Sequence, residues 1–128
     1  MPNKPILPAV GRDITALSEL AAQTAIDKMG EKTLIIDVAD MLVVTDFFVI
    51  TSGSSTRHVR TLVEAVEEKL KAVMNLRPSN MEGHDTFQWV LLDYGSFVVH
   101  VFEEERRSFY NLEKLWSDCP TVVWSNDD

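Results

Sequence analysis

Residues 48–59 read FVITSGSSTRHV and combine a short apolar run, a turn of small residues and the start of a helix. Backbone N–H groups at a helix N-terminus can bind phosphate, so this stretch raises the question of a nucleotide site. A P-loop needs a Gly-Lys-Ser/Thr sequence, and no lysine follows Gly53 in this turn. A dinucleotide-binding fingerprint needs several spaced glycines, and the turn has only Gly53. We therefore predict that Ser54 or Ser55 caps the helix and that Gly53 gives the turn its backbone freedom.

Nucleotidyltransferases also use a Gly-Ser turn that leads into a helix. Their chemistry needs paired carboxylates on a neighbouring strand to hold two metal ions. The acids that follow Gly53 are Glu64, Glu67 and Glu68, which fall on the solvated face of the predicted helix. The sequence therefore predicts no catalytic residue, no cofactor and no metal site. A nucleotide-binding enzyme stays open as an alternative, which a titration with ATP and magnesium would test.

The three histidines, His58, His84 and His100, and the one cysteine, Cys119, lack the spacing of metal ligands. His58 lies four residues after Ser54, but no nucleophile-elbow pattern surrounds that serine. His100 stands between two valines in a predicted strand. We interpret it as a core histidine with one hydrogen bond satisfied rather than as a catalytic base.

Other chemistry-bearing residues have simpler interpretations. Four aspartates at predicted strand ends could bind magnesium, but turn and cap roles explain each of them: Asp37, Asp40, Asp46 and Asp93. The run EEERR at 103–107 is typical of a solvated, self-neutralising surface. Large aromatic residues serve either as core or as interface anchors, and the sequence does not separate these roles for Trp89, Tyr110 and Trp116.

The elements that must position these residues follow from hydrophobic periodicity. Asp13 is the predicted N-cap of a first helix, and Gly30 its C′ residue. Strands are predicted at 33–38 and 47–52, and a long helix at 55–74 whose stripe is Val59, Leu62, Val63, Val66, Leu70 and Val73. A hairpin at 87–102 turns at 94–96, and one or two short helices over 103–116 have Leu112, Leu115 and Trp116 facing inward.

This order of elements predicts an α/β fold with a mixed β-sheet covered by helices. The strand, long helix and further strands require a parallel crossover, whereas the C-terminal hairpin is antiparallel. Residues 1–12 are expected to be a flexible leader and 13–117 a single domain. Residues 118–128 are expected to be a loose tail with a small apolar patch at 122–124.

The charge balance restricts the partner. The chain has 128 residues, of which 20 are acidic and 12 basic, so its net charge is −8. Binding of bare nucleic acid depends on a basic face, which argues against DNA or RNA as the main ligand. An acidic domain is suited instead to a basic protein partner. The single cysteine excludes an internal disulfide and fits a reducing cytoplasm, and no apolar run reaches membrane-spanning length.

Four motifs, taken together, resemble one family: TDFFVITSGSSTRHV, the Glu82–Gly83 pair, WVLLDYGSFVVHVF and RSFYNLEKLW. Their order and spacing are similar to those of the ribosomal silencing factor (RsfS, or Iojap) family, over about residues 17–117. The resemblance implies a nucleotidyltransferase-like fold that lacks the catalytic carboxylates, and a cytoplasmic, non-enzymatic protein. Many relatives carry an acid where this chain has Asn111, which weakens a charge role there.

The resemblance also implies a mechanism. Family members bind a basic protein on the joining face of the large ribosomal subunit, block the small subunit sterically and repress translation when nutrients are short. They form homodimers when isolated, and organellar relatives act in ribosome assembly. An assembly scaffold without anti-joining activity is therefore the second alternative function.

For the interface we expect an apolar centre surrounded by acidic residues. The candidates for the centre, from the hairpin and the closing helix, are Trp89, Tyr94 and Tyr110. The candidates for the acidic rim are Asp93, Glu103, Glu105 and Glu113.

Overall fold

The computed structural model describes residues 10–111, 114 and 116–122, apart from the side chains of 10–13, 109 and 110. The elements in chain order are α1 (Val10–Asp27), β1 (Glu31–Asp37), β2 (Phe47–Gly53), α2 (Thr56–Met74), β3 (Asn80–Glu82), β4 (Trp89–Asp93), β5 (Phe97–Glu103), α3 (Glu104–Tyr110) and β6 (Thr121–Val122). No helix within the described ranges is both long enough and apolar enough to span a membrane.

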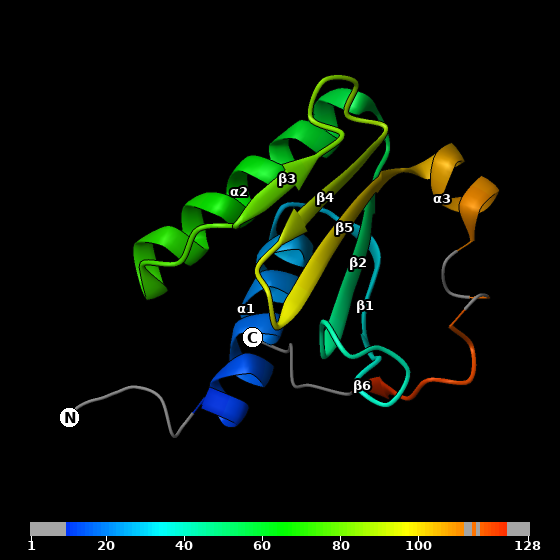
Figure 1. Cartoon of the computed structure of the whole chain (residues 1–128). Coiled ribbons are helices and arrows are strands. Elements are labelled where there is room, and N and C mark those ends of the chain that lie inside the picture. The colour runs from blue at the N-terminus through cyan, green and yellow to red at the C-terminus, as the bar shows by residue number, and fades with distance from the viewer. Residues whose placement is uncertain (1–9, 112–113, 115, 123–128) are drawn as a thin grey trace.

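In the described part of the chain, the strands form one sheet in the order β3-β4-β5-β2-β1-β6. β2 and β5 pair in parallel, and α2 lies on the connection between them, as a crossover requires. The pairs β1–β2, β1–β6, β3–β4 and β4–β5 are antiparallel. The predicted mixed sheet, with a parallel crossover and a C-terminal hairpin, is confirmed (Figure 1).

The sheet has two faces of different character, because side chains alternate along each strand. We call the side that packs on α1 and α2 the inner face; its strand residues include Ile35, Val49, Val90, Leu92, Val99 and Val101. We call the opposite side the outer face; its core residues include Ile36, Phe48, Ile50, Val98 and Phe102. Figure 1 shows both long helices on the same side of the sheet.

The helix α2 supplies most of the helical part of the inner core. Its buried residues are Val59, Leu62, Val63, Val66 and Leu70, which confirms the predicted stripe, and each contributes about 1.5–3 kcal/mol to folding when fully buried. Val73 was predicted to belong to the stripe but is 55% exposed. It lies at the C-terminal end of α2, which extends past the sheet (Figure 1). The N-cap is Ser55, whose Oγ accepts a hydrogen bond from the His58 backbone N–H.

The turn before α2 is closed by hydrogen bonds of His58. The His58 Nδ1 accepts a hydrogen bond from the Ser54 N–H at 3.0 Å, so the neutral ring carries its proton on Nε2. That Nε2–H donates to the Lys28 carbonyl at 2.9 Å, which ties the end of α1 to the start of α2. Gly53 is needed for space rather than for backbone freedom, since a Cβ there would lie 2.9 Å from the Val59 nitrogen.

The ends of α1 differ from the prediction. The helix begins at Val10, so Asp13 lies inside it and is not its N-cap. At the other end Met29, with φ of 69°, is the left-handed C′ residue that we had assigned to Gly30. The Gly30 N–H bonds back to the Ala25 carbonyl at 2.7 Å, and a Cβ on Gly30 would meet the Thr51 hydroxyl.

Two further expectations are wrong. Arg107, predicted to lie in a solvated run, is only 5% exposed and donates to the Glu31 carbonyl and the Ser52 hydroxyl. Thr121 and Val122, predicted to be part of a loose tail, pair with β1. Of the closing segment, Leu112 and Leu115 lie outside the described residues, whereas Trp116 is half-buried against Phe48 with ring centroids 5.5 Å apart.

Candidate partner-binding surface

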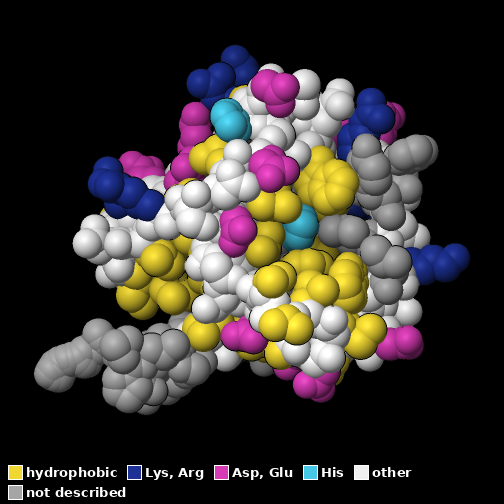
Figure 2. Space-filling model, viewed as in Figure 1, with side chains coloured by type: hydrophobic (Ala, Val, Ile, Leu, Met, Phe, Trp, Pro, Cys, Tyr) yellow, Lys and Arg dark blue, Asp and Glu magenta, His cyan; other side chains and the backbone are white. Residues whose placement is uncertain are grey.

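The outer face carries aromatic and apolar side chains that α1 and α2 leave uncovered. On the paired strands β4 and β5, Trp89 lies opposite Phe102 and Leu91 lies opposite His100. Trp89 and Leu91 are half-buried, so each presents part of its apolar surface to solvent. Figure 2 shows hydrophobic side chains gathered around one histidine on this side, with acidic side chains bordering them.

At the centre of the outer face, four aromatic side chains contact one another, and two of them share a hydrogen bond; we call Phe48, Trp89, His100 and Phe102 the aromatic cluster. The Trp89 Nε1–H donates to His100 Nδ1 at 3.1 Å, and the indole stacks on Phe102 with centroids 4.9 Å apart. Phe48 meets the His100 ring edge-on at 4.7 Å. Burial lowers the pKa of His100 to about 4, so the ring is neutral at pH 7. The interpretation of His100 as a core histidine with a hydrogen bond is confirmed.

A depression of about 310 Å³ lies beside this cluster, and Leu42, Val44, Thr45, Phe48, Ser79, Leu91, Asp93, Gly95, Val98 and His100 line it. Five of these ten residues are apolar: Leu42, Val44, Phe48, Leu91 and Val98. The lining comes from the β1–β2 loop, from β2, β4 and β5, from the β4–β5 turn and, through Ser79, from the connection between α2 and β3. Such a concave, largely apolar site can receive apolar side chains of a ligand or partner.

The β1–β2 loop exposes more apolar surface than a solvated loop needs. Val43 and Val44 have relative exposures of 103% and 81%, and Met41 one of 60%. Val44 also lines the depression, which makes the loop part of the same surface. Sequence reasoning missed this segment. The clustered apolar letters MLVV between acidic residues were the available signal, since loops are normally polar.

The structure brings two predicted site residues together on the outer face. Trp89 lies in the aromatic cluster, and Asp93 lines the depression, where its carboxylate accepts the Gly95 N–H at 2.8 Å. Glu103, half-buried, is the N-cap residue of α3, although its side chain makes no cap bond, and Glu105 is exposed on that helix.

Tyr94 lies on the other face of the sheet, and the last two candidates are not described. Tyr94 packs against the inner-face core and stacks on Phe97 at 4.9 Å, so its predicted place beside Trp89 in one apolar centre is wrong. Burial, and then the charge of Glu67, raise the pKa of Tyr94. The side chain of Tyr110 and all of Glu113 lie outside the described residues.

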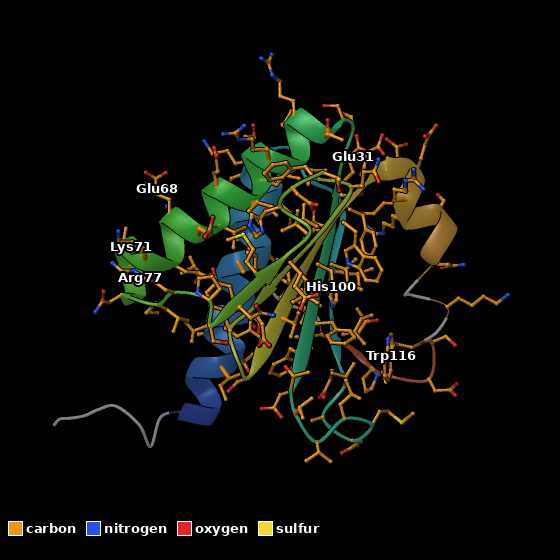
Figure 3. All side chains as sticks on the ribbon, turned by 45° about the horizontal axis from the view of Figure 1, so that its top comes forward. Glu31, Glu68, Lys71, Arg77, His100 and Trp116 are labelled. Carbon is orange, nitrogen blue, oxygen red and sulfur yellow. The ribbon has the colours of Figure 1, made fainter. Side chains whose placement is uncertain are left out.

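Other surfaces of the described residues are more polar than the outer face. Figure 3 labels Glu68, Lys71 and Arg77 near the end of α2, away from His100 on β5 and from Trp116 in the segment after α3. A polar pocket at the α3 end includes Glu31, Ser52 and Arg107. Within the described residues, no group of three or more His, Cys, Asp or Glu side chains could hold a metal ion.

The mixed sheet, the crossover helix and the uncovered aromatic face define a small α/β domain with a surface suited to a protein partner. The family model "Ribosomal silencing factor during starvation" matches residues 12–128. The chain therefore belongs to the ribosomal silencing factor family.

Individual relatives agree with this assignment. The chain is 36% identical to the ribosomal silencing factor RsfS of Halalkalibacterium halodurans, over 83% of this chain and 90% of that protein. It is similar to a crystal structure of a Chromobacterium violaceum protein, with a TM-score of 0.77, 32% identity and coverage of 81% and 86% of the two chains. It is also 38% identical to "Mitochondrial assembly of ribosomal large subunit protein 1" of Mus musculus, over 65% of this chain and 37% of that protein. The family name is that of a regulator rather than an enzyme, and membership supports a ribosome-associated silencing role.

Proposed function

We propose that this protein binds the large ribosomal subunit through its outer face and thereby prevents the small subunit from joining. The contact is with a basic ribosomal protein on the joining face, and translation is repressed under nutrient limitation. The protein acts in the cytoplasm, by occupying space and without catalysis.

The observation that carries the proposal is the uncovered outer face, with Trp89 and Leu91 half-buried and Val44 exposed. Large apolar groups at the centre of an interface set the dissociation rate, because water is excluded from them on binding. The net charge of −8 attracts a basic partner and speeds encounter. Ribosomal RNA repels the same charge, so the apolar contacts must supply the specificity.

Co-sedimentation with purified ribosomal particles tests the proposal. The protein should migrate with isolated large subunits and be absent from the peak of joined ribosomes. It should be absent from small subunits as well. Co-migration with joined ribosomes at an equal molar ratio would contradict the proposal, because a bound blocker and a joined small subunit cannot occupy one surface.

The name of the mouse relative favours assembly of the large ribosomal subunit as a second candidate function. This candidate predicts binding to incomplete large-subunit particles in preference to mature ones. Parallel sedimentation with precursor and mature particles separates the two functions.

A further inference from the structure

Two buried polar atoms, on residues that line the depression, have no hydrogen-bond partner among the described residues. They are Nε2 of His100 and Oγ1 of Thr45. His100 is 4% exposed and Thr45 is 6% exposed, so both residues are almost fully buried. Both residues line the depression, from different elements: His100 is on β5 and Thr45 on the β1–β2 loop.

The chemistry of each group follows from its neighbours. His100 Nδ1 accepts the Trp89 indole N–H, so the proton of the neutral ring lies on Nε2. Nε2–H is therefore a donor, and the Thr45 hydroxyl can donate or accept. Unsatisfied polar groups in an apolar site cost free energy, and a native fold keeps them where a ligand satisfies them or where they serve a function.

A peptide main chain offers a partner for each of these two groups. Its carbonyl accepts from a ring N–H, and its N–H donates to a hydroxyl. The apolar lining, with Leu42, Phe48 and Val98, suits the aliphatic side chains on either side of such a group. The volume of about 310 Å³ lies at the lower end of the range for ligand pockets, roughly 300–1,000 Å³.

We propose that the depression binds an apolar segment of the protein partner by its main chain, with a peptide carbonyl on His100 Nε2–H and a peptide N–H on Thr45 Oγ1. This inference rests on the proposed function, since it names what the outer face recognises. It makes Thr45 and His100 specificity residues, and it makes Trp89 a positioning residue that fixes the tautomer of His100.

Isosteric substitution tests the inference. Thr45→Val removes the hydroxyl at nearly constant shape. Because no bond within the described residues is lost, the variant should be as stable as the parent or more stable. Its affinity for isolated large subunits should fall about fivefold, as for one hydrogen bond. His100→Asn keeps an acceptor for the Trp89 N–H but removes the Nε2–H donor, and should weaken binding by about the same factor.

Thr51→Val is the matched control, since Thr51 is buried but its hydroxyl bonds the Thr33 hydroxyl at 2.7 Å. This variant should lose stability and keep its affinity. The measurements are urea unfolding of each free protein and binding to purified large subunits. If the parent protein binds large subunits and both Thr45→Val and His100→Asn bind with the same affinity as the parent, this inference is overturned and the proposed function is not. Absence of binding by the parent protein would overturn the proposed function and this inference together.

Discussion

The indole N–H of Trp89 donates a hydrogen bond to Nδ1 of the buried His100 at 3.1 Å. The two residues lie on neighbouring antiparallel strands, β4 and β5, and belong to the outer face. This bond holds a large aromatic side chain in one orientation at the centre of a surface that α1 and α2 leave open. A rigid, half-buried aromatic residue is the kind of anchor that dominates protein interfaces.

Replacing the donor should destabilise the fold. Trp89→Phe keeps an aromatic ring over Phe102 but leaves the His100 Nδ1 acceptor buried and unbonded. We expect a loss of about 1–3 kcal/mol in the free energy of unfolding, measured by urea denaturation at pH 7.5. Trp116→Phe is the control, because it shortens another outer-face tryptophan without touching the bond to His100. Equal losses in both variants would mean that the bond contributes nothing of its own.

Stability should fall on acidification through His100. Burial lowers its pKa to about 4 in the folded protein, from the ordinary value of 6.5. The unfolded chain therefore takes up a proton near pH 6.5 that the folded chain refuses until about pH 4, so stability is complete above pH 6.5 and is lost towards pH 4.

The size of this effect follows from about 1.4 kcal/mol per pKa unit. Between pH 7.5 and 5.0, His100 should cost the protein roughly 2 kcal/mol. The measurement is urea unfolding across this range for the parent and for His100→Asn, which cannot titrate there. Identical pH profiles for the two proteins would contradict the buried, neutral state of His100.

Acidic residues at the rim should control the rate of association. Asp93 lines the depression and Glu105 is exposed on α3, so the double variant Asp93→Asn with Glu105→Gln removes two charges on the proposed binding side. We expect slower association and a weaker salt dependence, with dissociation almost unchanged. Binding rates to immobilised large subunits over a salt series provide the measurement.

The control for this experiment carries the same change in net charge elsewhere. Glu64→Gln with Glu68→Gln neutralises two exposed residues of α2, on the helical side of the molecule. Its association rate should stay within a factor of about two of the parent, since only charges near the contact steer strongly across a Debye length of about 10 Å. Equal slowing by both double variants would show that net charge, and not the outer face, directs the encounter.

Hydrophobic periodicity and turn residues predict much of the fold from the sequence. The stripe from Val59 to Leu70 follows helical spacing, and the turn at 94–96 separates two apolar runs, so both elements could be placed from the sequence. The burial of Arg107 could not, because it depends on contacts with Glu31 and Ser52, which are distant in sequence. The pairing of Thr121 and Val122 with β1 could not be predicted either, because it joins residues that are distant in sequence.

The candidate site was predicted less completely than the fold. Trp89 and Asp93 are two positions of one strand face, yet Tyr94 follows Asp93 directly and lies on the inner face. The alternation along β4 was a signal that could have separated them. Thr45 had no signal of its own, since its burial arises only when the β1–β2 loop folds onto the outer face.

A matched pair of surface variants, assayed for inhibition of subunit joining, shows whether the outer face blocks the small subunit. Val44 is 81% exposed beside the depression and Val73 is 55% exposed on α2, so lysine at either position leaves the core intact. Joining of purified subunits is followed by light scattering while protein is titrated onto the large subunit. We expect the parent and Val73→Lys to block joining at the same concentration. Val44→Lys should need about tenfold more, because it places a cation against a basic partner and removes apolar contact. Equal inhibition by Val44→Lys and the parent would mean that the outer face is not the binding surface, and no inhibition by the parent would mean that the protein does not block joining.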